Sequence, residues 1–274
     1  MNSVDVAYAT RALSEDGFVV LPNAVAPAHI AALRDKMLAD LPALLTRRDA
    51  PFNFNTGNIQ QEPPPFPPYL SRDILLNEQA IAVTKALLGP GLKNGYYSGN
   101  TTIPGSGSRQ PVHPDTAQLW PHLEQATPPF AIVVNVPMVD MTPENGSTEV
   151  WPGTHLDTTL SIDQGDIKVP IEAVEARRKI RPPLQLTVPA GSIILRDIRL
   201  WHAGMPNHTA QPRPMIAMIH TIAWWGGGET LTFPKGTEEF FQHPDLHTQA
   251  RFVDEPIDYL HHSQAYDFKP EVAS

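Results

Sequence analysis

Proline occupies 30 of the 274 positions, about twice its usual share, and restricts the fold more than any other feature of the sequence. Proline lacks a backbone N–H and interrupts helices, so few helices and many loops are expected. In the second half of the chain, short apolar runs alternate with turn residues, as in residues 129–141, 191–202 and 213–225. Short strands with frequent turns are typical of an antiparallel sandwich or barrel. The sequence therefore predicts a mainly β protein.

The clearest helical patterns lie in the first third of the chain. Residues 17–25 form a short β-branched run, which predicts a strand. Apolar residues then recur three and four apart over residues 30–44, which predicts an amphipathic helix with Pro27 in its first turn. A second helix is predicted within residues 76–91, where Asn77 is a suitable N-cap and a Gly-Pro pair ends the pattern.

Residues 49–70 contain six prolines and no periodic pattern, so a loop is predicted there. Loops of this length are often lids over binding sites, and the aromatic residues of this one favour a lid over a passive surface segment. We expect a single domain over residues 1–274. Its helical and loop part covers residues 1–95, its β core covers 96–230 and its C-terminal extension covers 231–274. An insertion in the core, residues 157–183, is expected to hold one helix.

The charge balance narrows the classes of partner. The net charge is −9, and the sole dense basic run is at residues 175–181, which we interpret as a solvated helix end or loop. Nucleic acid and anionic membranes are therefore not expected as partners. A small-molecule substrate fits this composition better.

The absence of cysteine excludes disulfides, thiolate metal sites and cysteine nucleophiles. Any metal must then be held by His, Asp, Glu or carbonyl oxygen, which argues against structural zinc. The first 18 residues have neither the basic start nor the apolar core of a signal peptide, and no run is long enough to span a membrane. We expect a cytoplasmic protein, and the sequence leaves a homodimer open.

A His-x-Asp step occurs three times, as His113 with Asp115, His155 with Asp157, and His243 with Asp245. On a strand, side chains two apart share a face, so each step offers an imidazole and a carboxylate side by side. Such a pair is two thirds of the 2-His-1-carboxylate triad of non-haem Fe(II) enzymes. Taken alone the step is a weak signal, and a distant third ligand must decide among the copies.

The candidate third ligand is His202, at the end of the apolar run 191–202. A loop rich in Gly, Pro and Asn follows, and Arg213 opens the next apolar run. This pattern predicts that His202 and Arg213 lie on neighbouring antiparallel strands, near their shared turn. A guanidinium there would suit a buried carboxylate, because a buried charge needs a partner and arginine offers a planar pair of donors.

Several motifs in order resemble the phytanoyl-CoA dioxygenase (PhyH) family of Fe(II)/2-oxoglutarate-dependent oxygenases, and in particular its natural-product members. The family carries His-x-Asp, then an "NG…PGSH" segment, then a strand-end His with an Arg shortly after. Here the matching pieces are "HPD" at 113–115, "ENGSTEVWPGTH" at 144–155 and "RLWHAGMPN" at 199–207, with Arg213 following. The opening "DGFVVLPNAVAP" also looks like the family, so the resemblance spans residues 16–225.

The resemblance implies a double-stranded β-helix core, the jelly-roll of cupin-like proteins, flanked by N-terminal helices. It implies that Fe(II) is held by His113, Asp115 and His202, and that 2-oxoglutarate and O2 bind the iron. Arg213 would anchor the far carboxylate of 2-oxoglutarate, and Gln110 and Thr148 would lie near this cosubstrate. The implied reaction hydroxylates, desaturates or rearranges a small molecule, as in secondary metabolism, and releases succinate and CO2.

The resemblance also argues against a metal site at the other two His-x-Asp steps. His155 falls in the segment that matches "PGSH", a turn in the family, and His243 with Asp245 falls past the last apolar run, where Asp245 suits local backbone bonding. Related halogenases replace the iron-bound carboxylate by a small residue, so the retained Asp115 favours oxygenation or desaturation.

Two other interpretations stay open at this point. One is a metal-dependent cupin-type enzyme that does not use 2-oxoglutarate. The other is a non-catalytic binding protein on the same fold. Arg213 distinguishes the cupin-type enzyme from the dioxygenase, because only the dioxygenase needs Arg213 to hold 2-oxoglutarate.

Overall fold

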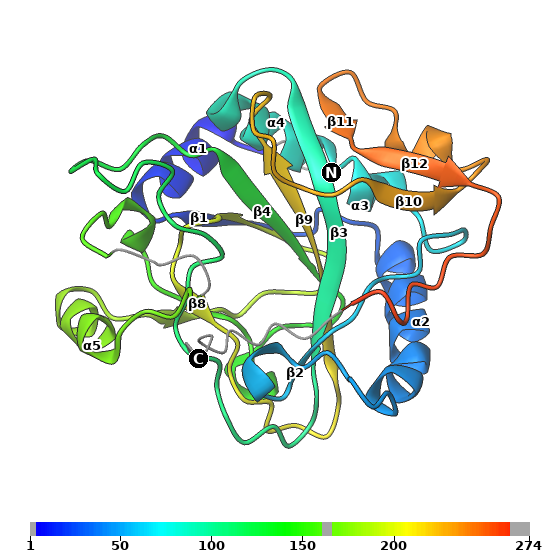
Figure 1. The fold of residues 1–274 in the computed structure, drawn as a ribbon, viewed down its shortest axis with the longest axis horizontal. Helices are drawn as coiled ribbons and strands as arrows, with labels where there is room; N and C mark the ends of the chain where they lie inside the picture. Colours follow the sequence, from blue (N-terminus) through cyan, green and yellow to red (C-terminus); the bar gives the residue numbers. More distant parts are fainter. Residues whose placement is uncertain (1–3, 161–165, 264–274) are drawn as a thin grey trace, which may run out of the picture.

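A seven-stranded sheet forms the centre of the computed structural model, which describes residues 4–160 and 166–263 (Figure 1). The strand order is β1-β7-β4-β9-β3-β11, and β2 pairs with β3 off this path. Every pairing in this sheet is antiparallel except that of β11 with β3. The strands are β1 (Phe18–Leu21), β2 (Asn58–Gln60), β3 (Leu92–Thr102), β4 (Ala131–Pro137), β7 (Ile193–Asp197), β9 (Arg213–Thr221) and β11 (Leu246–Thr248).

Two smaller sheets complete the β structure of the described residues. One joins β6, β5 and β8 in that order, and the other is a parallel pair of β10 and β12. His202 of the three-stranded sheet lines one cavity together with residues of the large sheet, so both sheets border this cavity. The strands are β5 (Glu149–Val150), β6 (Leu184–Gln185), β8 (His202–Ala203), β10 (Leu231–Pro234) and β12 (Ala250–Val253).

Helices are few, as the proline content predicts, and most of them lie in the first third of the chain. The two helices expected there are confirmed: Pro27 opens α2, and the Asn77 side chain accepts from two backbone N–H groups at the start of α4. The helix expected in the insertion is also confirmed, as α5. The helix α1, whose N-cap is Asp5, was not predicted from the sequence. The helices are α1 (Val6–Glu15), α2 (Pro27–Leu45), α3 (Arg72–Leu75), α4 (Glu78–Leu88) and α5 (Ile171–Ile180), with single turns at η1 (Asn53–Asn55), η2 (Pro143–Asn145), η3 (Thr154–Leu156) and η4 (Glu238–Phe241).

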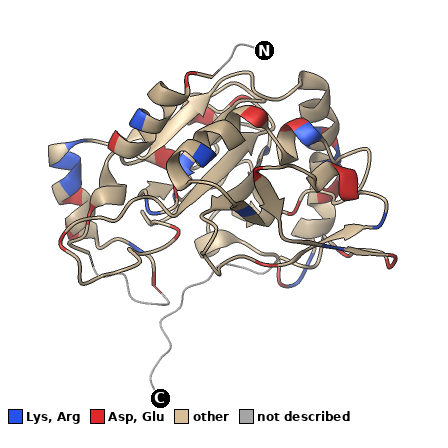
Figure 2. Ribbon diagram, turned by 90° about the horizontal axis from the view of Figure 1, so that it is seen from above, with Lys and Arg blue, Asp and Glu red and all other residues tan. Residues whose placement is uncertain are grey.

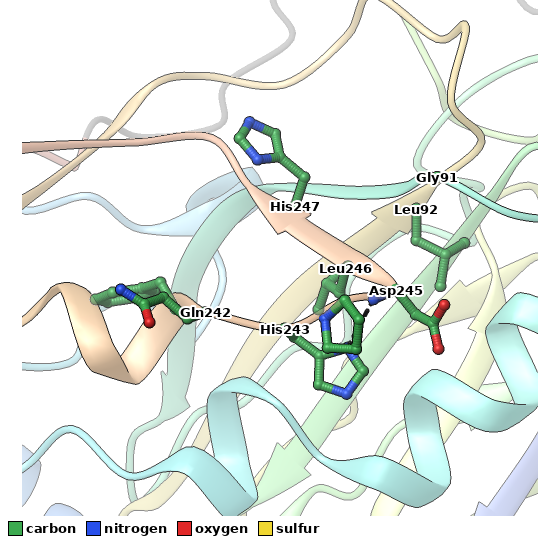
Figure 3. A pocket seen from close by; sticks show the side chains of 9 residues that line it. Gly91, Leu92, Gln242, His243, Asp245, Leu246 and His247 are labelled. Carbon is green, nitrogen blue, oxygen red and sulfur yellow. Dashed lines mark hydrogen bonds between the residues drawn. The ribbon is translucent and has the colours of Figure 1, made fainter.

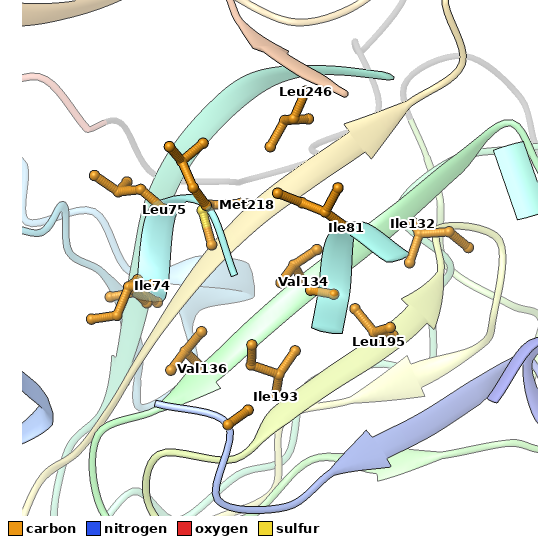
Figure 4. Close-up of a cluster of buried hydrophobic side chains, with 14 of the residues drawn as sticks. Ile74, Leu75, Ile81, Ile132, Val134, Val136, Ile193, Leu195, Met218 and Leu246 are labelled. Atoms are coloured by element: carbon orange, nitrogen blue, oxygen red, sulfur yellow. The ribbon is translucent and has the colours of Figure 1, made fainter. Parts of the chain in front are cut away.

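The main hydrophobic core lies between the large sheet and helices α1 to α4, and Figure 4 shows part of it, with Ile74 and Leu75 of α3 and Ile81 of α4. Along β4, Ile132, Val134 and Val136 enter this core, whereas Val133 and Asn135 line the cavity on the opposite face. This is the alternation that a strand imposes on its side chains. Each buried aliphatic side chain contributes roughly 1.5–3 kcal/mol. The helical face therefore stabilises the sheet, and the other face is left for a site.

The prediction of a featureless loop over residues 49–70 is wrong in part. The segment contains η1, and β2 pairs with β3 so that Asn58 lies opposite Thr102. On the outer edge of β3, β11 pairs only with the first residues of the strand. The remaining backbone groups of this edge can therefore bond to a segment that has no strand pattern of its own, which here is β2. The large sheet also takes β1 and β11 from outside residues 96–230.

His202 and Arg213 do not lie on neighbouring strands, contrary to the prediction. His202 is in β8 of the three-stranded sheet, and Arg213 opens β9 of the large sheet. The intervening loop crosses from one sheet to the other instead of forming a hairpin. Both side chains nevertheless line the same cavity.

Acidic and basic side chains are interspersed over the helices and loops (Figure 2). The basic run 175–181 belongs to the end of α5, as expected, and there Arg178 lies over the Trp151 ring while Arg181 pairs with Asp16. Cations in a last helical turn interact favourably with the helix dipole. No helix among the described residues is both long and apolar enough to cross a membrane.

Candidate metal centre

His113, Asp115 and His202 meet in one cluster. One potential ligand atom from each lies within 4.8 Å of the others, and among the described residues this is the one such group of three His, Cys, Asp or Glu. The backbone brings them together: His113 N–H donates to His202 O at 3.0 Å, and His202 N–H donates to His113 O at 2.9 Å. His113 forms only this isolated bridge, so the regular strand assumed for the His-x-Asp step is absent.

Both imidazoles are oriented by backbone carbonyls. His113 Nδ1 lies 2.8 Å from Pro111 O, and His202 Nδ1 lies 3.0 Å from Leu200 O. Each Nδ1 therefore carries a proton, which leaves the Nε2 lone pairs for a metal. Burial lowers the pKa of His113, and burial together with Arg196 lowers the pKa of His202 well below its usual value. Neutral imidazoles are the form that binds metals.

Asp115 is ionised and its two oxygens have different neighbours. Oδ1 lies 3.5 Å from His202 Nε2, and Oδ2 accepts from Arg196 Nη2 at 2.7 Å. Burial alone would raise the pKa of Asp115, but Arg196 and His202 outweigh burial and hold this pKa well below its usual range. Two neutral imidazole nitrogens and one carboxylate are the donor set that suits Fe(II) with open positions. The residues present therefore fit the metal.

Arg213 is buried on the cavity side of β9, with 1% of its surface exposed. Its Nη2 donates to Thr102 Oγ1 at 2.6 Å and its Nε donates to Asn145 O at 3.2 Å. Nη1 is buried and has no partner among the described residues. Burial lowers the pKa of Arg213 to about 10, so it remains a cation near neutral pH. A cation with an unused buried donor fits an anionic ligand.

Gln110 and Thr148 line the same cavity as Arg213. The Gln110 Oε1 accepts from Gly204 N–H at 2.8 Å. A Cβ at Gly204 would lie 2.8 Å from this oxygen, so a glycine lets the backbone approach. The Thr102 hydroxyl, which accepts from Arg213, also accepts from Asn58 Nδ2 at 3.2 Å. This second contact was not predicted from the sequence, because it depends on the pairing of β2 with β3.

The cavity has a volume of about 1370 Å³. Its floor is the face of the large sheet that carries Asn135, Arg196 and Arg213. Its walls include η1, β2 and the segment 251–263. Phe54 of η1 has a positive φ of 54°, which a bulky residue rarely adopts, and its ring centroid lies 4.6 Å from that of His113. Part of the expected lid 49–70 thus borders the cavity, while its motion stays a prediction.

The second His-Pro-Asp lies outside this cavity, in a separate pocket at the start of β11 (Figure 3). His243 Nε2 faces the carboxylate of Glu78 in α4 at 3.4 Å, and Asp245 Oδ1 accepts from Lys85 of the same helix at 2.7 Å. The local backbone bonding expected of the Asp245 carboxylate is therefore wrong. It is the backbone N–H of Asp245 that donates locally, to His243 Nδ1 at 3.1 Å.

Four further histidines lie outside this group of three. His155 is in the turn η3, as expected, and its Nε2 lies 3.2 Å from Ser14 O. His122 and His208 are exposed. His220 is buried on the helical face of β9, where its Nδ1 lies 3.0 Å from Thr84 Oγ1.

Two histidines and one aspartate are grouped at a cavity bordered by two β-sheets. This arrangement is typical of metal-binding proteins with the cupin-like jelly-roll fold. Within this class the family is shown by sequence: residues 13–215 match the model of the family Phytanoyl-CoA dioxygenase (PhyH), and the chain belongs to this family.

Individual relatives agree with this family. The chain is 28% identical over 204 residues to Dioxygenase af480 of Aspergillus fumigatus, covering 72% of this chain and 60% of the relative. It is 28% identical over 237 residues to the iron/alpha-ketoglutarate-dependent dioxygenase ausU of Aspergillus calidoustus, covering 80% of this chain and 72% of the relative. The chain therefore spans less than two thirds of the first relative's length.

The structure is similar to the crystal structure of SnoK, a non-haem alpha-ketoglutarate-dependent carbocyclase from nogalamycin biosynthesis. The TM-score is 0.60 at 17% identity, covering 81% of this chain and 88% of SnoK. At this identity the likeness concerns the fold. It confirms the predicted double-stranded β-helix with N-terminal helices.

Proposed function

We propose that this chain is a non-haem Fe(II)/2-oxoglutarate-dependent dioxygenase that oxidises a small molecule. One observation carries the proposal: the cluster of His113, Asp115 and His202 lines the same cavity as Arg213, whose Nη1 is a buried donor with no partner among the described residues. A metal site alone would fit many cupin-type enzymes. A buried cation across the cavity adds a place for the far carboxylate of a dicarboxylic acid.

In this proposal His113 and His202 bind Fe(II) through Nε2 and Asp115 binds it through Oδ1. When bound, the iron supplies the reduction of O2 that accompanies decarboxylation of 2-oxoglutarate to succinate and CO2. Arg213 anchors the C5 carboxylate of 2-oxoglutarate, and Gln110 and Thr148 contact this cosubstrate. The backbone carbonyls of Pro111 and Leu200 hold the imidazole tautomers.

The proposed substrate is a secondary metabolite, which the enzyme hydroxylates, desaturates or rearranges. The cavity volume of about 1370 Å³ exceeds the usual range of small-ligand sites and leaves room for a sizeable substrate beside the cosubstrate. The relatives' names also favour this substrate class, since ausU is an iron/alpha-ketoglutarate-dependent dioxygenase and SnoK acts in nogalamycin biosynthesis. An acyl-CoA is a poorer fit, because its phosphates need basic surface that this acidic chain offers mainly in α5.

Three further parts of the proposal concern the whole protein. Residues 1–274 act as one dioxygenase domain, with the β core at 96–230 between an N-terminal part and a C-terminal extension that supplies part of the cavity wall. The enzyme works in the cytoplasm without nucleic acid or membrane partners, consistent with its lack of cysteine and its net charge of −9. A homodimer is the assembly to test by size-exclusion chromatography.

An anaerobic titration tests the proposal. Fe(II) added with 2-oxoglutarate should give a weak visible charge-transfer band, and Fe(II) alone should not. Succinate release from 2-oxoglutarate, measured across a panel of metabolites, should then identify the substrate. A folded protein that binds Fe(II) but shows neither the band nor succinate would instead be a cupin-type metalloprotein that does not use 2-oxoglutarate.

A further inference from the structure

Arg196 is a buried cation that touches the metal centre without belonging to the ligand set. It lies on β7, directly across the strand pairing from Val133, and 6% of its surface is exposed. Its Nη2 donates to Asp115 Oδ2 at 2.7 Å. Sequence analysis passed over this residue, although a charged residue inside the apolar run 191–202 was a signal that a buried partner had to exist.

We propose that Arg196 is a positioning residue, which holds Asp115 so that Oδ1 alone is directed at the metal. This inference rests on the proposed function. Oδ1 already faces His202 Nε2 at 3.5 Å, while the bond to Arg196 occupies Oδ2. The carboxylate would thereby offer a metal one oxygen, Oδ1, while Oδ2 stays bonded to Arg196.

Asp115 needs such a partner because little else restrains its side chain. Its backbone N–H is bonded to Ile198 O at 3.0 Å, but it lies in a bend and one third of its side-chain surface is open to the cavity. Among the described residues, Arg196 is the group that donates to its carboxylate outside the metal cluster. Without Arg196 the side chain could rotate, and both oxygens would be equally available.

Asp115 is also the acceptor that holds Arg196. Arg196 Nη1 lies 3.3 Å from His202 Nδ1, but this nitrogen is also 3.0 Å from Leu200 O. The carbonyl can only accept, so Nδ1 carries the proton and has no lone pair for a guanidinium. The contact of Arg196 with His202 is therefore one of proximity, and the directional bond is the one to Asp115.

The charge of Arg196 and its positioning role have opposite effects on metal binding. A cation so close to the cluster repels a divalent metal and competes with it for the carboxylate. Removal of a cation that acted only through its charge would therefore strengthen Fe(II) binding. Removal of a positioning residue weakens it, by about 10- to 100-fold for groups that orient metal ligands. The sign of the change thus separates the two roles.

The experiment is anaerobic Fe(II) titration of the full chain without 2-oxoglutarate, comparing Arg196→Met and Arg196→Lys with the unaltered protein. We expect the Kd for Fe(II) to rise about 10- to 100-fold in Arg196→Met. We expect Arg196→Lys to recover much of this loss, since Lys keeps a donor for Oδ2. The matched control is Arg199→Met, which removes another buried arginine of the same segment, paired with Asp197 at 2.8 Å. It should lower the melting temperature but leave the Kd of the folded protein unchanged.

The proposal is overturned if Arg196→Met binds Fe(II) as tightly as the unaltered protein, or more tightly. It is also overturned if Arg199→Met weakens Fe(II) binding to the same degree, because the effect would then be one of general stability. Should Arg196→Met fail to fold, Arg196→Leu, which also has no donor for Oδ2, is titrated in its place and the same outcomes decide. If the unaltered protein binds no Fe(II), the proposed function fails, and the role of Arg196 fails with it.

Discussion

The tripeptide His-Pro-Asp occurs twice, and the two copies serve different purposes. In the first copy, His113 exchanges backbone hydrogen bonds with His202, and Asp115 lies beside a second imidazole and a buried guanidinium. In the second copy, His243 and Asp245 contact side chains of α4 at the protein surface. The same three residues thus contribute to a candidate metal site in one copy and to ion pairs with α4 in the other, and the difference lies in what the fold brings beside them.

The two copies also belong to opposite faces of the large sheet. Met215 and Ala217 of β9 line the cavity with the first copy, while Ile216 and Met218 enter the core beneath α4, the helix that the second copy contacts. Substitutions on the cavity face should therefore alter chemistry, and those on the helical face should alter stability.

The largest expected contrast is between the two aspartates. Asp115→Ala should lower succinate release roughly 1000-fold, about 4 kcal/mol of transition-state stabilisation, because it removes a proposed iron ligand. Asp245→Ala should leave the rate unchanged. Steady-state kinetics with Fe(II) at saturation measures both. Equal losses in the two variants would mean that the second copy also takes part in the reaction.

Arg213 should produce the next largest effect, and it is specific to 2-oxoglutarate. Arg213→Ala should raise the KM for 2-oxoglutarate about 30-fold or more, since loss of one partner of a buried charge pair costs about 2–5 kcal/mol. The Kd for Fe(II), measured without 2-oxoglutarate, should stay within about twofold if the two sites are separate. Arg213→Lys should recover only part of the loss, since Lys offers no planar fork. Unchanged kinetics for 2-oxoglutarate would favour an enzyme that does not use it.

His220, on the helical face, should affect stability and only in acid. Burial, with a smaller contribution from His243, lowers the pKa of His220 from 6.5 to about 4. The unfolded chain therefore binds a proton between these values and the folded chain does not, so this contribution to stability is complete above pH 6.5 and is lost as the pH falls toward 4. The loss should be about 3 kcal/mol. Urea unfolding from pH 7 to pH 4 should show it in the unaltered protein.

The comparison protein for this measurement is His220→Asn, which keeps a donor for Thr84. Other groups titrate over the same range in both proteins, so the difference between the two curves isolates His220. Parallel curves would show that His220 has no part in the acid sensitivity.

Local sequence signals were sufficient for part of the fold. The α2 and α4 helices carry their own apolar spacing and caps, so both were predicted from neighbouring residues. The β2 strand has no such signal, because its hydrogen bonds are provided by the edge of β3, about 40 residues away. The loop after His202 misled the prediction for a related reason: its Gly, Pro and Asn residues suit a crossing between sheets as well as a hairpin.

The residues of the candidate site likewise include some that were predicted from the sequence and some that were not. His113, Asp115, His202 and Arg213 were found because motif order preserves them even when their strands are misplaced. Arg196 was missed because "RD" in β7 gives two adjacent charges, and periodicity alone does not say which one faces the cavity. Both are buried: Arg196 reaches Asp115, while Asp197 pairs with Arg199 on the other side. Thr102, which bonds to Arg213, belongs to a distant segment and has no sequence signal, whereas the Asn145 carbonyl that accepts from Arg213 lies in the motif "ENGSTEVWPGTH".

The smallest predicted effect concerns the ion pair of the second copy. Asp245 and Lys85 are 2.7 Å apart, the same distance as Asp115 and Arg196, but the Lys85 side chain is 44% exposed whereas that of Arg196 is 7% exposed. Water screens an exposed pair, and ordering a long lysine costs side-chain entropy, so such pairs contribute about 0.2–1 kcal/mol. A double-mutant cycle of Lys85→Ala and Asp245→Ala, read by urea unfolding, should give a coupling energy in this range that shrinks in high salt. A salt-independent coupling above about 2 kcal/mol would contradict the screened-pair argument, because only a pair shielded from water resists salt in this way.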